Sequence, residues 1–267
     1  DETKKAIIKE SENPEQLVFS FVPYSIARIS PFFPMSRKDM KDRQYQVLEW
    51  ENSWGQMVLK GEKLSIYDET VLLACLSLMR KYKSETFETT RYELCKEMGV
   101  TPCRDTYHAV WAGLERLTGA RISLKVWKPG TQKKKTSRRM VNTILAGTME
   151  EEETDRISIT INPYFLRMYA ENLVVTIDMK FRASLKGDIT KALYRFFRSQ
   201  TGMTYECHLL TLCKAINLDV TMDTFRLRAR IKKGFAELKK AGYLKRATLM
   251  KSDVVKVWKS QKGELLC

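Results

Sequence analysis

The stretch YELCKEMGVTPCRDTYHAVWAGLERL, residues 92–117, reads as a helix, a turn and a second helix. A related stretch, LTLCKAINLDVTMDTFRLRARIKKGFAELKKAGYL, occupies residues 210–244. Both contain Leu-Cys-Lys in the first helix, Val-Thr before the second helix and a leucine that closes the second helix. This repetition indicates that the chain contains one helical unit twice.

The residues before the first copy predict a hairpin from Gln56 and a helix over residues 69–82, capped by Asp68. A second helix is expected to begin near Thr90 and to end at Gly99.

Thr101 followed by Pro102 predicts the start of the third helix, because a missing N–H costs nothing at the first helical position. Strands are then expected on both sides of the basic loop KPGTQKKKTSRR. A further strand, RISITIN, follows the acidic turn MEEEETD, which we interpret as a solvated bend.

The same order is predicted in the second half of the chain, where the third helix is expected to start at Thr221. Three helices followed by a two-stranded ribbon are the winged helix-turn-helix arrangement. We therefore predict an α+β fold with tandem winged helix-turn-helix domains. The expected divisions are an irregular N-terminal arm at 1–43, a first winged-helix domain at 44–173 and a second at 174–267.

The net charge of +15 is unevenly distributed along the 267 residues. Residues 121–139 hold eight basic residues and no acid, and residues 222–259 hold twelve basic residues and three acids. The remaining residues together carry −2, so the positive charge lies in the second half of each repeat. A concentrated field of this kind is typical of a face that binds a polyanion.

Several classes of protein are disfavoured by composition. No stretch approaches the roughly 18 apolar residues of a membrane span, and residues 1–16 lack the apolar core of a signal peptide, so a cytoplasmic location without membrane contact is expected. Six cysteines without a CxxC pair, and only two histidines, favour reduced thiols over zinc or disulfides. We therefore expect no metal and no cofactor.

The third helix of the second repeat is the expected reader of DNA. Arg226 and Arg230 belong to its N-terminal half, which enters the major groove most deeply in this class, and arginine binds guanine with two hydrogen bonds. A basic helix face taken alone is often only a solvated surface. We interpret this one as DNA-binding because basic residues also occur on the ribbon that follows the helix. The expected DNA-binding residues are Arg226, Arg228, Arg230, Lys232, Lys233, Lys240, Lys245 and Arg246.

The third helix of the first repeat has little charge, so its ribbon is expected to neutralise phosphates. His108 is either a surface residue or a base reader, and Trp111 is either outward or part of the core. The candidate residues here are Arg104, Thr106, His108, Lys133, Lys134, Lys135, Arg138 and Arg139.

The sequence resembles the TrfA-like plasmid replication initiators, within the iteron-binding Rep proteins built from two winged helices. The resemblance covers residues 26–259. It depends on the order and spacing of FETTRYELCKEMG, LERL, KKTSR, LKGDITKALYRFFRSQ, CKAINLDVTMDTFR and FAELKKAGYL.

The resemblance implies binding of double-stranded DNA at repeated origin sequences, opening of an AT-rich duplex and recruitment of host proteins. Those partners would be an initiator ATPase, the replicative helicase and the sliding clamp, and dimeric relatives also form a homodimer through the first domain. Clamp binding in the family uses a Gln-Leu-x-Leu-Phe-like peptide, from which QLVFSF at residues 16–21 departs at the fourth and fifth positions.

An enzyme is not expected. A relaxase would need a close histidine pair, whereas the two histidines lie a hundred residues apart, and there is no Gly-x4-Gly-Lys-Ser/Thr sequence for an ATPase of the P-loop type. The alternative to a replication initiator is a winged-helix transcription regulator that binds its own promoter.

Overall fold

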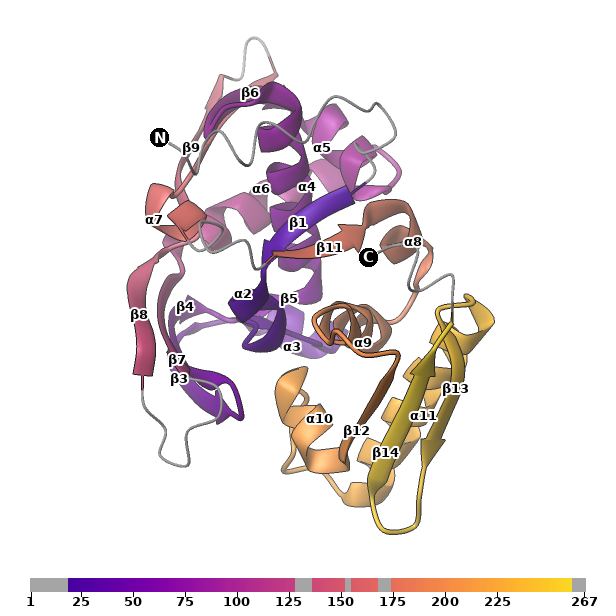
Figure 1. The fold of residues 1–267 in the computed structure, drawn as a ribbon. Helices are drawn as coiled ribbons and strands as arrows, with labels where there is room; N and C mark the ends of the chain where they lie inside the picture. Colours follow the sequence, from indigo (N-terminus) through magenta and orange to yellow (C-terminus); the bar gives the residue numbers. More distant parts are fainter. Residues whose placement is uncertain (1–18, 128–135, 152–154, 168–173, 261–267) are drawn as a thin grey trace.

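The computed structural model describes residues 19–127, 136–151, 155–167 and 174–260. These residues form two units that meet at a shared junction, with the first unit at the upper left of Figure 1 and the second at the lower right. Both units contain, in the same order, a helix, a strand, two helices and an antiparallel hairpin.

The first unit is built around one long helix and a three-stranded sheet. Its elements are α4 (Ile66–Tyr82), β6 (Thr86–Thr90), α5 (Arg91–Met98), α6 (Arg104–Gly119), β9 (Leu145–Glu151) and β10 (Arg156–Ile161). Strand β10 lies between β6 and β9 and pairs antiparallel with both. Ile157 and Ile159 alternate with polar residues along β10 and are fully buried, so one side of this sheet faces the helices.

The second unit repeats this sheet topology. Its elements are α9 (Asp188–Arg198), β12 (Thr204–His208), α10 (Leu209–Ala215), α11 (Thr224–Lys240), β13 (Leu244–Leu249) and β14 (Val254–Lys259). The last strand, β14, again lies between the other two. Apolar residues three and four apart on α11 are buried at Ile231, Phe235 and Leu238, and Phe197 of α9 packs against Phe235 with ring centroids 6.2 Å apart.

Three helix starts differ from the sequence-based expectation. Helix α4 begins after Ser65, which forms a capping box with Asp68, so Asp68 lies in the first turn and is not the cap. Helix α6 begins after Cys103 and α11 after Asp223, each two residues later than expected. The expected limits of α5 are confirmed, because Thr90 caps its start and Gly99 ends it with a φ of 69°.

The N-terminal segment, in its described residues 19–43, is not the irregular arm that we expected. It contains β1 (Phe19–Pro23), α2 (Tyr24–Arg28), β2 (Phe32–Phe33) and α3 (Arg37–Lys41). Ile26 and Ile29 are buried, and the Ser20 hydroxyl donates to the Leu73 carbonyl of α4 at 2.9 Å. This segment is therefore part of the core.

A second sheet in the first unit was not anticipated. Strands β3 (Tyr45–Asn52), β4 (Gly55–Glu62), β7 (Arg121–Trp127) and β8 (Thr136–Thr143) form it in that order. A hairpin was expected to begin at Gln56. The observed β3–β4 hairpin begins earlier, and Gln56 lies in its second strand, β4. The two-residue strand β5 (Leu64–Ser65) pairs with β2.

The link between the units is also ordered. It contains α7 (Pro163–Leu166), β11 (Val174–Asp178) and α8 (Met179–Ser184). Strand β11 pairs antiparallel with β1, from Val174 opposite Pro23 to Asp178 opposite Phe19. The N-terminal segment thus holds the chain at the point where it passes into the second unit.

Candidate nucleic-acid interface

Helix α11 presents a basic face to solvent. Asp223 caps its start by accepting from the Phe225 amide at 2.9 Å, and Asp219 stabilises the preceding turn through the Thr221 hydroxyl at 2.7 Å. Most of the basic residues predicted on this helix are exposed. They are Arg226, Arg230, Lys232, Lys233 and Lys240, and Lys239 is exposed with them.

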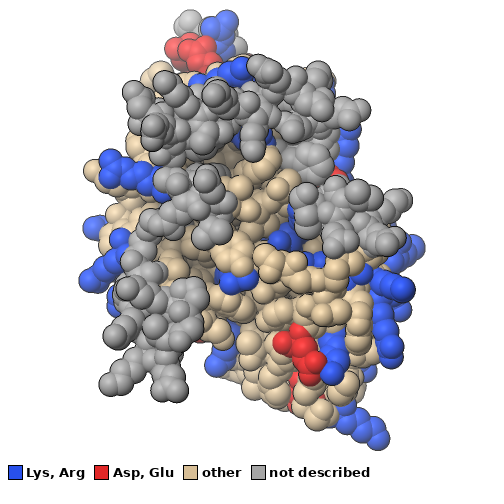
Figure 2. Space-filling model, in the orientation of Figure 1, with Lys and Arg blue, Asp and Glu red and all other residues tan. Residues whose placement is uncertain are grey.

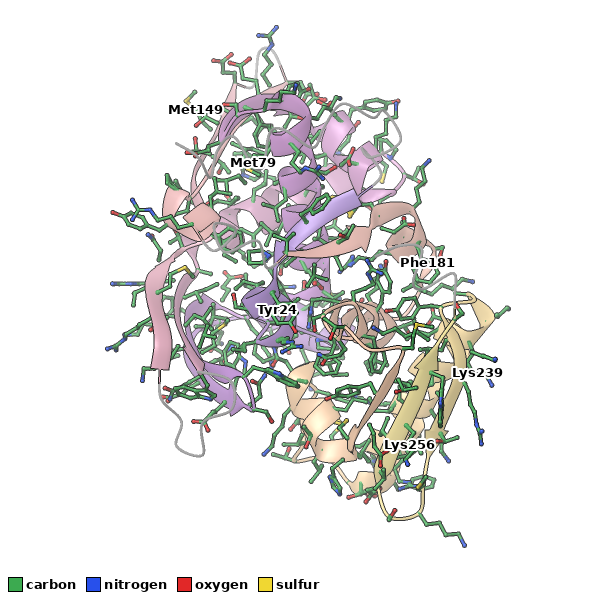
Figure 3. The ribbon with its side chains drawn as sticks, in the orientation of Figure 1. Tyr24, Met79, Met149, Phe181, Lys239 and Lys256 are labelled. Atoms are coloured by element: carbon green, nitrogen blue, oxygen red, sulfur yellow. The ribbon has the colours of Figure 1, made fainter. Side chains whose placement is uncertain are left out.

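Figure 2 shows how basic side chains are distributed on the front of the molecule. They gather along the right-hand margin of the second unit, beside α11 and β13, and along the left-hand margin near β8. Figure 3 places Lys239 at the outer edge of the second unit and Lys256 on the β14 side of the hairpin. Lys256 is paired with Glu206 of β12 at 2.8 Å, so its charge is locally compensated.

Arg228 was predicted to bind DNA, but its side chain is bonded to the hairpin. Its guanidinium forms an ion pair with Asp253 in the β13–β14 turn, and also donates to the Met250 carbonyl at 2.8 Å. The side chain is only partly exposed. Arg228 therefore connects α11 to the hairpin and is not one of the free cations of the face.

The hairpin places two predicted residues at the surface. Lys245 and Arg246 are both exposed on β13, and the Arg246 guanidinium lies 5.1 Å from the centre of the Trp258 ring. Glu237 of α11 does not join the basic face but turns toward α9. Its carboxylate accepts from the Thr190 hydroxyl at 2.6 Å and from the Gly187 amide at 3.3 Å.

Helix α6 of the first unit carries fewer cations. Arg104 and His108 are exposed, and Thr106 is half-buried with its hydroxyl 3.1 Å from the Cys103 thiol. Trp111 is half-buried and donates to Glu115 at 3.0 Å. The surface of this helix is thus mixed in charge.

The strands expected on both sides of the basic loop are β7 and β8, which pair with each other. This β7–β8 hairpin joins β3 and β4, however, whereas the hairpin equivalent to β13–β14 in sheet order is β9–β10. That hairpin carries Glu150 and Glu151 before its turn. Arg139 is exposed on β8, while Lys133, Lys134, Lys135 and the Arg138 side chain lie outside the described residues.

The two units are locked together by a buried ion-pair cluster. Glu69 of α4 lies 2.9 Å from Arg182 of α8 and 2.9 Å from Arg195 of α9, and all three side chains are buried. Burial would raise the pKa of the Glu69 carboxyl, but Arg195 and Arg182 outweigh it and hold the pKa below its usual value.

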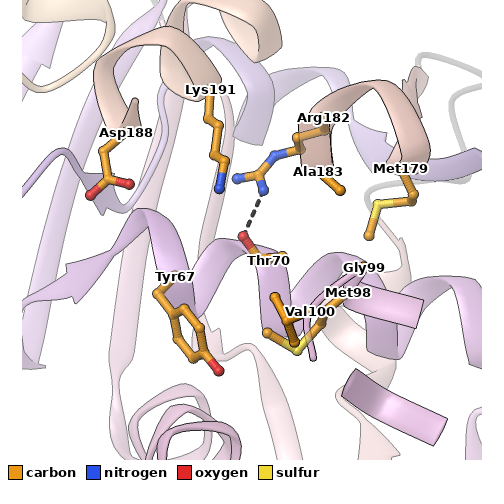
Figure 4. Close-up of a pocket in the computed structure, with 10 residues that line it drawn as sticks. All are labelled: Tyr67, Thr70, Met98, Gly99, Val100, Met179, Arg182, Ala183, Asp188 and Lys191. Atoms are coloured by element: carbon orange, nitrogen blue, oxygen red, sulfur yellow. Dashed lines mark hydrogen bonds between the residues drawn. The ribbon is translucent and has the colours of Figure 1, made fainter. Parts of the chain in front are cut away.

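A small cavity of about 80 Å³ lies beside this cluster, between α4, the end of α5, α8 and α9. Figure 4 shows the Arg182 guanidinium and the Lys191 amino group pointing toward each other above Thr70, whose hydroxyl accepts from Arg182 at 2.6 Å. Burial, and then the charge of Arg182, lower the pKa of Lys191. This junction fixes how α6 and α11 are placed relative to each other.

Residues 25–231 match the family description "Replication initiator protein A". The chain belongs to that family. No curated protein sequence matches this initiator.

Solved structures share the fold of this initiator over nearly its whole length. A selenomethionine structure of RctB domains 2 and 3 is 13% identical, with a TM-score of 0.60 over 89% of this chain and 98% of that chain. A second structure of RctB domains 2–3 is 14% identical, with a TM-score of 0.57 over 91% and 99%.

The Pi initiator protein in complex with iteron DNA is 12% identical, with a TM-score of 0.53 over 92% of this chain and 99% of that chain. At these identities the similarity shows the fold alone. The chain is therefore a Rep-like initiator by family, with initiator-like architecture.

Two other kinds of site are absent from the described part of this initiator. Within the described residues, no helix has the length and apolar content that a membrane crossing needs. Among the same residues, no group of three or more His, Cys, Asp or Glu side chains is arranged to hold a metal ion.

One exposed residue on α11 was missed by reasoning from the sequence. Phe225 lies in the first turn of the helix and is 75% exposed. Its position could have identified it from the sequence, because it directly precedes Arg226 on a helix predicted to enter DNA. Only charged residues of this helix were predicted to bind DNA.

Proposed function

We propose that this initiator binds direct repeats of duplex DNA at a plasmid origin, as the TrfA-like initiators that it resembles do. In this proposal the two units are winged helices, α6 and α11 are their recognition helices, and the second unit is the main sequence reader. The observation that carries it is the exposed basic face of α11, connected through Arg228 to the turn of the β13–β14 hairpin.

The arrangement of the two units supports binding along one duplex. In Figure 1, α11 lies behind the β13–β14 hairpin and α6 lies behind α4, so both third helices lie toward the far side of the view. A solved initiator of the same fold, the Pi protein, is in complex with iteron DNA. We also propose that the two winged-helix domains comprise residues 44–173 and 174–267. Residues 19–43 pack with the first of them and belong to the first unit.

The two units are expected to contact DNA unequally. The exposed cations of α11 and of β13 favour tight contact with bases and phosphates in the second unit. In the first unit, Arg104 and His108 offer few contacts, and Arg156 of the β9–β10 hairpin is paired with Glu88 at 3.3 Å. We propose that the β7–β8 loop supplies the phosphate contacts of this unit instead.

Origin opening and recruitment of a host ATPase, helicase and sliding clamp are further parts of the proposal. The clamp is the least favoured partner, because residues 19–21 of the candidate peptide lie in β1 and pair with β11. The Arg80 guanidinium also covers the Phe21 ring at 3.8 Å. Binding a clamp through this peptide would require β1 to leave its sheet.

Self-association is proposed through the outer face of the β3–β4–β7–β8 sheet. Tyr45 and Val47 are 72% and 60% exposed there, and a shallow groove of about 340 Å³ crosses the face between Val58, Ser123 and Val141, which lie opposite one another on β4, β7 and β8. Exposed acids and bases share this face, so a second copy related by a two-fold axis would be complementary in charge. These charged residues are Glu49, Glu51, Lys60, Glu62, Arg121 and Arg139.

A footprint on the DNA that flanks the gene tests the proposed function. We expect protection of direct repeats about two helical turns apart, since a tandem reader on one face of the duplex requires that spacing. Protection of a single palindrome in the gene's own promoter would instead support the transcription regulator. Protection of no sequence would contradict both.

A further inference from the structure

The exposed face of α11 is apolar where the helix begins. Phe225 is 75% exposed, and no ring of a described residue packs against it. Single exposed apolar residues are common on protein surfaces, so exposure alone decides nothing. The position of Phe225 on the helix is the informative fact.

The helical geometry places Phe225 beside Ala229. Residues four apart lie about 40° apart around an α-helix, one turn above each other, so the ring and the Ala229 methyl group form one small apolar surface. Ala229 is also exposed. Arg226 and Arg230 lie on one side of this pair, and Lys232 follows on the next turn.

The cations and the apolar pair suit different parts of DNA. The N-terminal half of a recognition helix lies deepest in the major groove, where the thymine methyl group is the apolar feature that a side chain can contact. Phosphates lie at the edges of the groove, where flanking basic side chains reach them. An apolar centre flanked by cations therefore matches a groove floor that contains thymine.

We propose that Phe225, together with Ala229, is a specificity-determining residue that reads a thymine methyl group in the major groove. This proposal rests on the proposed function, because it requires α11 to enter duplex DNA. It predicts that the repeat recognised by the second unit contains an A·T pair whose methyl group is essential for full affinity.

The experiment uses the full chain and duplexes enriched from a random library by binding to the wild-type protein. Each thymine of the enriched sequence is replaced in turn by uracil, which lacks only the methyl group. At one or more positions we expect wild-type affinity to fall about fourfold, as for one buried methyl or methylene group. Phe225→Ala should bind the thymine and uracil duplexes equally, whereas Phe225→Leu should keep part of the preference.

Tyr164→Ala is the matched control, because Tyr164 is an exposed aromatic residue of α7, in the link between the units. It should retain the full preference for thymine. The proposal is overturned if Phe225→Ala keeps the wild-type ratio, or if the wild type prefers thymine at no position. If the wild type enriches no sequence at all, the proposed function itself fails, so the two failures are distinguishable.

Discussion

Arg195 of α9 lies 2.9 Å from Glu69 of α4, with both side chains almost fully buried. Helices α4 and α9 are the equivalent helices of the two units, so this ion pair crosses the junction. Arg182 of α8 completes the cluster. Three charges removed from water are costly unless they compensate one another, so the cluster favours a single placement of the units.

Replacing Glu69 with Gln should destabilise the protein by about 3–5 kcal/mol, because two buried guanidinium groups would lose their counter-ion. Urea denaturation at pH 7 measures this loss. The control is the triple replacement Glu69→Leu, Arg182→Met and Arg195→Met, which removes all three charges together and should be less harmful than the single change. If the single change costs less than the triple change, the ion pairs are not what holds the junction.

The loss of stability caused by Glu69→Gln should depend on pH. The folded-state pKa of Glu69 lies below the usual value of 4.5. Its contribution to stability is therefore fully present above about pH 4.5 and is lost as pH falls through the folded-state pKa. The difference in stability between the wild type and Glu69→Gln should narrow below pH 4.5, when measured by denaturation across that range. A difference that does not change with pH would show that Glu69 is not ionised in the folded protein.

Arg228 and Asp253 should be energetically coupled, because they connect α11 to the hairpin turn. A double-mutant cycle with Arg228→Met and Asp253→Asn should give a coupling energy of about 0.5–3 kcal/mol in stability. On DNA, Arg228→Met should leave the slope of log K against log salt nearly unchanged, since Arg228 is not a free phosphate contact. A slope reduced by about one unit would instead place Arg228 on a phosphate.

The outer face of the four-stranded sheet should govern self-association. Val47→Glu places a charge in the exposed apolar surface and should convert any dimer into monomer, as measured by analytical ultracentrifugation. Met149→Glu is the matched control, because Met149 is exposed on β9, outside this sheet. Equal effects of the two variants would argue against an interface on the sheet.

Replacing Lys133, Lys134 and Lys135 together with alanine should flatten the slope of log K against log salt by about one unit for each phosphate that these lysines neutralise. The measurement is a binding titration at several salt concentrations with a fixed duplex. An unchanged slope would mean that the three lysines of the β7–β8 loop bind no phosphate.

The repeat was predictable because its signals are local. Thr90 and Gly99 mark the limits of α5 in the sequence, and the buried stripe of α11 follows from apolar residues three and four apart. The start of α4 was also readable in principle, since Ser65 and Asp68 have the spacing of a capping box. Choosing Asp68 as the cap overlooked that spacing.

The second sheet could not be predicted in this way. Strand β7 directly follows α6 and pairs with β8, as in a winged-helix ribbon, but it also pairs with β4, where Lys60 lies opposite Arg121. Alternation along each strand is the same for either partner, so the pattern does not identify the partner. The hydrogen bond from Arg28 to the Ser199 carbonyl, at 3.0 Å, joins residues 171 positions apart and has no local signal either.

The most direct test of DNA binding through α11 compares Arg226→Ala and Arg230→Ala with the wild type on the enriched duplex and on random DNA. We expect each substitution to weaken binding to the enriched duplex by roughly 1–3 kcal/mol, with a smaller loss on random DNA. An equal loss on both would show that the arginines contact only phosphates. Unchanged binding to the enriched duplex and to random DNA would contradict the claim that this protein binds DNA through α11.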